Sequence, residues 1–141
     1  MLQVIFLDFD GVLHPKMNGS FELINNFLTV LKHFPKATVV ISSSWKVGLS
    51  KEALASIFGQ SVNRIIGCTT SSKGQNRQGE ILSYVRNHCI ECYIAIDDDC
   101  RSTLFEPNCD FLFRTNYFTG ITEDNIPTLI KFMEHRRLKK L

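Results

Sequence analysis

The chain has 141 residues, of which 44% are hydrophobic and 21% charged, and its formal net charge is +2. These values are typical of one globular domain, taken here as residues 1–141, and the weak charge does not predict a nucleic-acid binder. No apolar run approaches the roughly 20 residues of a membrane span, and the first residues lack the basic start of a signal peptide. The five cysteines are irregularly spaced, which favours reduced thiols in a cytoplasmic protein.

Apolar runs alternate with amphipathic stretches along the chain, which is typical of a parallel sheet covered by helices. In chain order, the pattern predicts a strand at 4–7, a helix at 21–34, strand 38–41, helix 50–58, strand 62–66, helix 77–87, strands 92–96 and 111–113, and helix 121–136. Ser20 is the expected N-cap of the first helix, and Pro35 its stop. We therefore expect a three-layer α/β/α sandwich around a mainly parallel, Rossmann-like, five-stranded sheet.

Acidic residues follow two of the predicted strands. Asp8 and Asp10 come directly after the first strand, and Asp97 and Asp98 come after the fourth. Because parallel strands end at the same edge of a sheet, both groups should meet there. Converging carboxylates repel one another unless a cation neutralises them, and an all-oxygen ligand set suits Mg²⁺. The alternative is that these aspartates only form turns.

Asp8 and Asp10 are separated by a single residue, Phe9. In an extended backbone both carboxylates lie on one side, while Phe9 turns into the core. Gly11 then permits a sharp turn or a close approach of the backbone. One carboxylate can attack phosphorus while the other handles the proton of the transferring oxygen.

These residues carry a resemblance to the haloacid dehalogenase (HAD) superfamily. The string from Asp8 to Val12 resembles its first motif, and the strand ending in Ser42-Ser43-Ser44-Trp45 resembles the second. Arg77 stands where the third motif has Lys or Arg, and Asp97-Asp98 resembles the two-acid fourth motif. The four motifs occur in the family's order, which makes the set far more specific than any one of them.

The resemblance implies a role for each residue. Asp8 would be the nucleophile that forms an aspartyl-phosphate, and Asp10 the acid and base, with its backbone carbonyl on the metal. Asp98 would ligate Mg²⁺ directly and Asp97 would support it, so the expected metal set is Asp8, Asp10, Asp97 and Asp98. Ser43 would bind a phosphate oxygen, with Ser42 as the competing register.

Catalysis of this kind also needs a cation to offset the charge of the phosphoryl oxygens. Arg77 is the favoured candidate because it stands at the position of the third motif. The family more often has Lys there, but a guanidinium can take its place by binding phosphate through two hydrogen bonds. Lys73 and Lys46 lie in plausible loops and are rivals, and Lys46 could instead contact the substrate beyond its phosphate. The expected phosphate-binding set is therefore Ser42, Ser43, Lys46 and Arg77.

The strings DGVLHP, SSSWK and IDDD resemble more narrowly the HAD domain of "Swiss army knife" RNA-repair proteins. The gaps between motifs are filled by predicted elements and leave no room for a cap domain. An uncovered site favours a phosphate carried on a macromolecule such as a nucleic-acid end. Two alternatives stay open: a non-catalytic phosphate-sensing or phosphorylatable domain, and a phosphotransferase acting on a small metabolite. The sequence leaves the oligomeric state open.

Several other residues lie near the predicted edge. Asp99 is expected to be a solvated acid or the cap of the following turn. His14 could approach substrate or could be a surface residue before Pro15. Phe118, Thr119 and Gly120 follow the fifth strand and are candidates for shaping the pocket.

Overall fold

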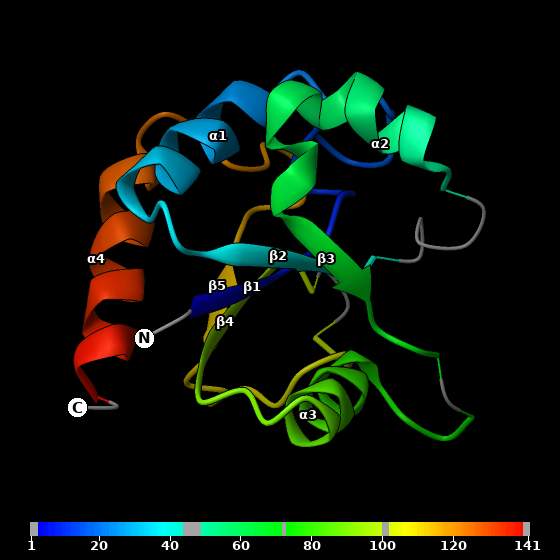
Figure 1. The fold of residues 1–141 in the computed structure, drawn as a ribbon, viewed down its shortest axis with the longest axis vertical. Helices are drawn as coiled ribbons and strands as arrows, with labels where there is room; N and C mark the ends of the chain where they lie inside the picture. The colour runs from blue at the N-terminus through cyan, green and yellow to red at the C-terminus, as the bar shows by residue number, and fades with distance from the viewer. Residues whose placement is uncertain (1–2, 44–48, 72, 100–101, 140–141) are drawn as a thin grey trace.

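The structure, a computed structural model, describes residues 3–43, 49–71, 73–99 and 102–139 (Figure 1). Five strands form one sheet in the order β3-β2-β1-β4-β5, and every neighbouring pair is parallel. The strands are β1 Gln3–Leu7, β2 Thr38–Ile41, β3 Ile65–Cys68, β4 Cys92–Asp97 and β5 Leu112–Arg114. The predicted Rossmann-like sheet is confirmed, and it is fully rather than mainly parallel.

Helices cover both faces of this sheet, which confirms the three-layer sandwich. The helices α1 (Ile24–His33), α2 (Lys51–Phe58) and α4 (Asn125–Lys139) lie on one face, and α3 (Arg77–Asn87) lies on the other (Figure 1). Side chains alternate between the two faces along each strand. Ile5 and Leu7 of β1 therefore join the core beneath α1 and α4, while Val4 and Phe6 join the core beneath α3.

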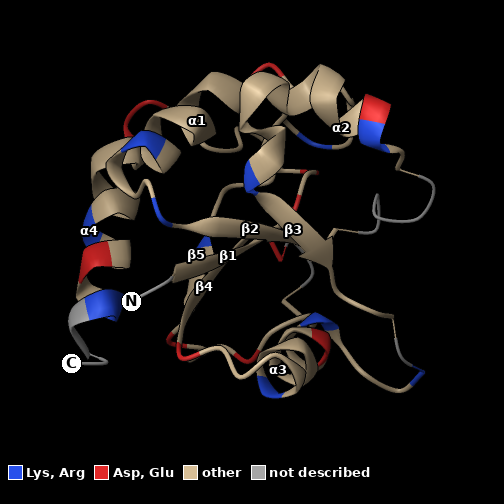
Figure 2. Ribbon diagram, in the orientation of Figure 1, with Lys and Arg blue, Asp and Glu red and all other residues tan. Residues whose placement is uncertain are grey.

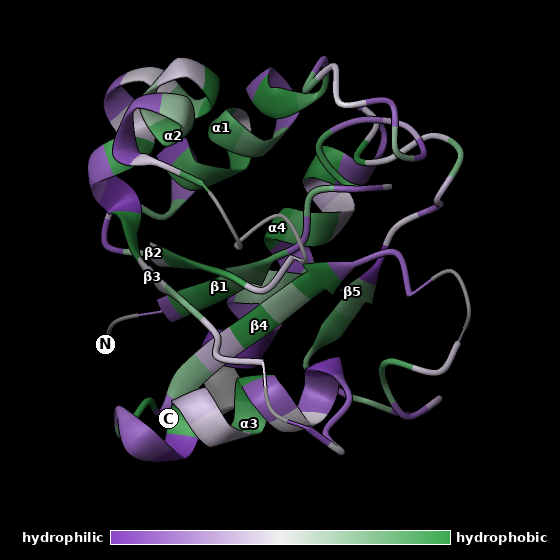
Figure 3. Cartoon of the chain, turned by 90° about the vertical axis from the view of Figure 1, so that its right-hand side faces the viewer, coloured by the Kyte–Doolittle hydropathy of each residue, from purple (hydrophilic) through white to green (hydrophobic). Residues whose placement is uncertain are grey.

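The central strands are buried on both faces. Strands β1 and β2 are hydrophobic almost throughout in Figure 3, as expected for strands covered on two sides. Among the described residues, the segment from 8 to 23 holds only turns and isolated bridges, and no cap domain is inserted. No described helix has the length and apolarity to cross a membrane.

The first helix begins later than the sequence predicts. It starts at Ile24 rather than at residue 21, because Phe21 has a left-handed backbone with φ of 53°. The Phe21 ring packs edge-on against Phe9, at 5.5 Å between ring centroids, so this side chain belongs to the core while its backbone turns. The prediction of Ser20 as the N-cap is wrong: the Ser20 hydroxyl accepts from the backbone N–H of Glu22, and the cap position is Leu23.

The third strand is also displaced from its predicted range. Residues Gly59–Arg64 form a 3₁₀ helix, η2, and β3 follows it. The Arg64 guanidinium donates to the carbonyls of Ala37 at 2.7 Å and Phe34 at 2.6 Å. Val62 lies in this helical turn and packs against the core from there. A short apolar run in the sequence does not distinguish such a turn from a strand.

The last helix starts at Asn125, four residues after the predicted start. Ile121 is fully buried, and its N–H donates to the carbonyl of Val12 at 2.9 Å, which ties this segment to the first loop instead of to the helix. Basic residues lie near the C-terminal end of α4 (Figure 2). One of them, Arg136, is buried over the ring of Tyr93 and lies 3.4 Å from the carboxylate of Asp110.

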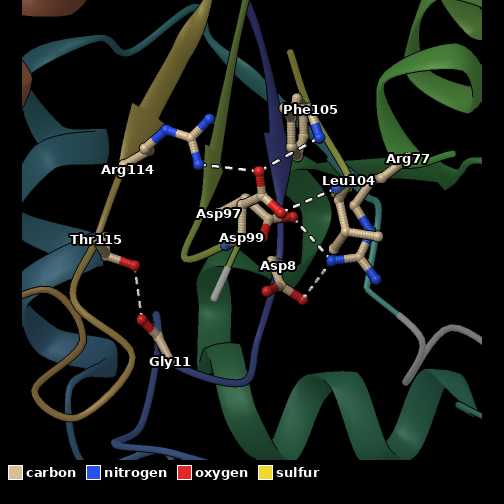
Figure 4. Close-up of polar contacts among 9 residues, drawn as sticks. All are labelled: Asp8, Gly11, Arg77, Asp97, Asp99, Leu104, Phe105, Arg114 and Thr115. Carbon is tan, nitrogen blue, oxygen red and sulfur yellow. Dashed lines mark hydrogen bonds and ion pairs between the residues drawn. The ribbon is translucent and has the colours of Figure 1, made fainter. Parts of the chain in front are cut away.

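Asp99 holds the loop that leads from β4 to β5, so the prediction of a solvated acid is wrong. Its side chain is buried and accepts hydrogen bonds from the N–H groups of Leu104 at 3.0 Å and Phe105 at 3.3 Å. The Arg114 guanidinium, at the end of β5, lies 2.9 Å from the same carboxylate. The alternative expectation, a capping role in the following turn, is confirmed (Figure 4).

We expect Asp99→Ala to lower the free energy of unfolding by about 3 kcal/mol, because it leaves two backbone N–H groups and Arg114 without this acceptor. Denaturant unfolding measures the change. The matched control is Glu106→Ala, in the same loop, whose side chain is exposed. That control should cost less than about 1 kcal/mol, and equal losses for the two variants would contradict this account of Asp99.

Candidate active site

The sheet register brings the predicted residues to one level at its carboxyl edge. The last paired residues of β1, β2 and β4 include Leu7, Ile41 and Ile96, and the ladder continues one residue further. The N–H of Asp8 donates to the Ile96 carbonyl at 3.1 Å, and the N–H of Ser42 donates to the Leu7 carbonyl at 3.0 Å. Asp8, Ser42 and Asp97 therefore stand side by side on three neighbouring strands.

Alternation along the strands decides which face these side chains take. Phe6 packs beneath α3 and Leu7 packs on the opposite face, so the next residue, Asp8, returns to the α3 face. The same count places Ser42 on that face, since Val40 lies beneath α3. Phe9 is fully buried on the other face, as predicted.

Three carboxylates gather here, from Asp8, Asp97 and Asp98. Each offers an oxygen within 4.8 Å of the other two; Asp8 and Asp97 are buried, and Asp98 is half-buried. Gly11 closes this group from the side. A Cβ atom at Gly11 would lie 2.8 Å from the Asp98 carboxyl carbon, so only glycine fits beside that acid. The structure thus brings Asp8 of the first acidic motif together with Asp97 and Asp98 of the second, while the Asp10 carboxylate is not part of this group. Figure 4 shows Asp8 beside Asp97.

Arg77 reaches this group from the first turn of α3. The side chain of Asn76 caps the helix by accepting from the N–H of Gly79 at 2.9 Å, which fixes where the helix begins. The Arg77 guanidinium lies 2.8 Å from the Asp97 carboxylate and 3.4 Å from that of Asp8 (Figure 4). Of its rivals, Lys73 is exposed on the preceding loop and Lys46 lies outside the described residues.

Burial sets the protonation of these groups. It raises the pKa of Asp8 well above its usual value, and the charge of Asp97 raises it further, against the opposing effect of Arg77. The pKa of Asp97 rises to about 6, again mainly through burial, although Arg77 and the N–H of Asp99 favour its charged form. Burial alone would lower the pKa of Arg77, but the carboxylates of Asp97 and Asp8 outweigh it and the pKa rises.

Asp10 stands apart from the three carboxylates. Its Oδ1 lies 2.7 Å from Nε2 of His14, which is fully buried and meets the Phe21 ring edge-on at 4.7 Å between centroids. His14 is thus a positioning partner of Asp10, and the alternative of a surface residue is wrong. The spacing of four residues in the string DGVLHP was the available signal, but spacing alone does not distinguish this pair from two exposed side chains.

The two candidate serines lie in different surroundings. Ser42 lines a cavity of about 190 Å³ together with Asn76, Arg77 and Leu104. Its buried hydroxyl has no hydrogen-bond partner among the described residues. Ser43 is fully buried, and the residues that follow it, 44–48, lie outside the described residues. The hydroxyl that shares a cavity with Arg77 is therefore that of Ser42.

Thr115 completes the arrangement and was not singled out by its sequence. Its N–H donates to the Asp97 carbonyl at 3.2 Å, and its buried hydroxyl donates to the Gly11 carbonyl at 2.6 Å (Figure 4). Thr115 therefore joins the end of β4 to the loop that carries Asp10. A threonine after a short strand carries no sequence signal for such a role.

The donor set fits a hard divalent cation. All three groups offer oxygen, and one guanidinium beside three carboxylates leaves the ionised group with a net negative charge. Both oxygens of Asp97 are already bonded, one to Arg77 and one to the N–H of Asp99 at 2.8 Å. Asp8 and Asp98 are therefore the better placed direct ligands, with Asp97 holding Arg77 beside them.

Comparison with known proteins identifies a family. The family model described as "HAD domain in Swiss Army Knife RNA repair proteins" matches residues 4–126. That stretch contains all five strands except the first residue of β1, and every acid of the site. No curated protein and no solved structure matches the chain.

We expect Mg²⁺ to raise the melting temperature, because a cation relieves the repulsion among buried carboxylates. At a Mg²⁺ concentration 100 times its dissociation constant, the free energy of unfolding should rise by about 2.7 kcal/mol. Without the ion, the raised pKa values make stability fall as pH rises through about 6, where Asp97 ionises. With the ion, protons compete less as pH rises, so the Mg²⁺-induced shift should be larger at pH 8 than at pH 5. Asp98→Asn should abolish the shift in a thermal melt. A shift that persists in Asp98→Asn would contradict this ligand set.

Proposed function

The chain belongs to the family of HAD domains found in Swiss Army Knife RNA repair proteins, and we propose that it is a Mg²⁺-dependent phosphomonoester hydrolase that works through a phosphoryl group carried on Asp8. HAD-type phosphatase chemistry is what the family supports. The finer assignment rests on one observation: Asp8, Asp98, Arg77 and Ser42 lie together at one edge of the sheet.

In the first step, a carboxylate oxygen of Asp8 attacks phosphorus and forms an acyl-phosphate bond while the bond from phosphorus to the leaving oxygen breaks. Asp10 gives its proton to that leaving oxygen. His14 holds the Asp10 carboxyl through the contact of 2.7 Å, so the proton donor is oriented before substrate arrives.

In the second step, water attacks the phosphorus of the aspartyl-phosphate. Asp10 takes the proton of that water, the Asp8–phosphorus bond breaks, and inorganic phosphate leaves. A group that activates water in this way argues for turnover and against a long-lived phosphorylated signalling state.

Arg77 and the Ser42 hydroxyl line one cavity and would hold the phosphoryl oxygens there. A Mg²⁺ ion held by Asp8 and Asp98 would neutralise charge on the phosphoryl group. Because burial and Asp97 raise the pKa of Asp8, the metal-free protein keeps this residue protonated more readily than a surface aspartate. A nucleophile must be ionised, so cation binding and attack are linked through the same carboxylate.

The absence of a cap among the described residues supports a bulky substrate, because nothing inserted between the motifs covers the site. A phosphorylated nucleic-acid end or nucleotide fits both this openness and the family. A phosphotransferase would use the same residues, and the two differ only in whether water or an alcohol accepts the phosphoryl group.

We expect native protein with Mg²⁺ to release inorganic phosphate from an aryl phosphate, and Asp8→Asn to abolish this release. Asp10→Asn should reduce it about 10²–10⁴-fold, because only proton transfer is lost. Each variant must keep the native circular dichroism spectrum. Well-folded native protein without turnover across divalent metals would instead support a phosphate-binding domain.

The two serines can be separated by matched variants. Ser42→Ala should lower kcat/KM about 100-fold, since it removes a hydrogen-bond donor to the phosphoryl oxygens. Ser43→Ala should lower it much less, because the cavity that contains Arg77 is lined by Ser42. Steady-state kinetics on the aryl phosphate measures both, and a larger loss for Ser43→Ala would reverse the assignment.

A further inference from the structure

An exposed aromatic and cationic cluster lies on the loops beside the candidate active site. It consists of Lys16, Met17, Tyr117 and Phe118, which we call the rim cluster. Met17 is 69% exposed and Phe118 is 65% exposed, the two highest values among the large hydrophobic side chains of the described residues. A domain of this size has little reason to hold two such side chains in water at one place, which marks the rim cluster as a contact surface.

Backbone hydrogen bonds attach the rim cluster to the catalytic loop. The N–H of Gly11 donates to the Lys16 carbonyl at 2.9 Å, and the N–H of Lys16 donates to the Tyr117 carbonyl at 2.7 Å. Lys16 has a left-handed backbone, with φ of 52°, a conformation that its two flanking bonds maintain. Since Gly11 follows Asp10 directly, the rim cluster begins one hydrogen bond away from the proposed acid and base.

The loop of residues 115–120, which carries Tyr117 and Phe118, is also held in place by hydrogen bonds. Gly120 donates its N–H to the Asn116 carbonyl at 2.7 Å, and a Cβ atom at Gly120 would lie 2.7 Å from the Val12 carbonyl oxygen. The N–H of Phe118 donates to the side chain of Asn116 at 2.9 Å. Thr115, at the start of this loop, bonds to Gly11. The loop is therefore anchored at both ends and presents Phe118 to solvent.

The chemistry of the rim cluster indicates what it recognises. The Lys16 ammonium lies 5.4 Å from the centroid of the Phe118 ring, and Tyr117 meets that ring edge-on at 5.4 Å between centroids. A pre-positioned, exposed ring offers a surface for stacking, and the adjacent ammonium attracts an anion. A nucleotide combines a planar base with phosphate charge.

We propose that Phe118, held by Lys16 and Tyr117, is the stacking surface for the nucleobase of a nucleotide whose phosphomonoester lies at Asp8. This inference rests on the proposed hydrolase and names its substrate class from residues outside the phosphoryl site. Stacking depends on the planar face of a base and not on its identity, so the preference would be for a nucleotide and not for one sequence.

The test compares Phe118→Leu with native protein on adenosine 3′- and 5′-monophosphate and on glycerol phosphate, which lacks a ring. Phe118→Leu keeps an apolar side chain but removes the ring face. We expect kcat/KM for the preferred nucleotide to fall about tenfold, mainly through KM, with glycerol phosphate changed less than twofold. Phe118→Trp should restore the nucleotide value. Ile66→Ala, which alters another exposed hydrophobic residue, on edge strand β3, should change neither substrate.

Three outcomes would overturn the inference. Equal losses on both substrates would make Phe118 a support for the catalytic loop, and unchanged kinetics would leave it no part in binding. If kcat/KM for O-phosphotyrosine falls equally in Phe118→Leu, the substrate would be a phosphoprotein instead of a nucleotide.

Hydrolysis of glycerol phosphate by the native protein tests the proposed function separately. Should all turnover be absent, calorimetric titration of adenosine monophosphate into Asp8→Asn decides the inference alone: binding must weaken about tenfold when Phe118→Leu is added.

Discussion

The electrostatic conflict at the end of β1 and β4 governs the rest of the structure. Parallel strands in register force the carboxylates of Asp8 and Asp97 to the same level, and Asp98 follows at once. Among the described residues, Arg77 brings one positive charge to these three acids, so this group carries a net negative charge when all of its members are ionised. Residues that fix the site, such as Asn76 at the start of α3, matter because they aim this guanidinium.

Much of this arrangement could be predicted because it depends on local patterns. An apolar run that ends in aspartate identifies both a strand and its carboxyl end, and the rule that parallel strands share an edge supplies the rest. What could not be predicted depends on contacts between distant segments. Asp99 is an anchor only because β5 returns beside β4 with Arg114. The buried His14 meets the ring of Phe21, whose backbone turns back toward it, and the sequence does not predict this contact.

The choice between Ser42 and Ser43 depends on the alternation of side chains along the strand. Side chains alternate strictly along β1 and β2, and Asp8 and Ser42 each stand one residue beyond a paired position, Leu7 with Ile41. Counting from that pair places both on the same face. The family resemblance, by contrast, places the hydroxyl two residues before Trp45, which lies outside the described residues. The alternation of the strand therefore supports Ser42 as the phosphate-binding serine that we propose.

Gly11 connects these features, and for a steric reason. Its N–H bonds to the carbonyls of His14 and Lys16, its carbonyl accepts from Thr115, and its Cα faces the side chain of Asp98. Gly11 has a φ of 71° and leaves no room for a Cβ atom, so any other residue type would strain this position. The glycine after the second aspartate is thus required by close packing rather than by flexibility. Because the Asp10–His14 pair, the Asp98 carboxylate and the rim cluster all meet this one residue, a displacement at Gly11 would disturb the proposed chemistry and the proposed recognition surface together.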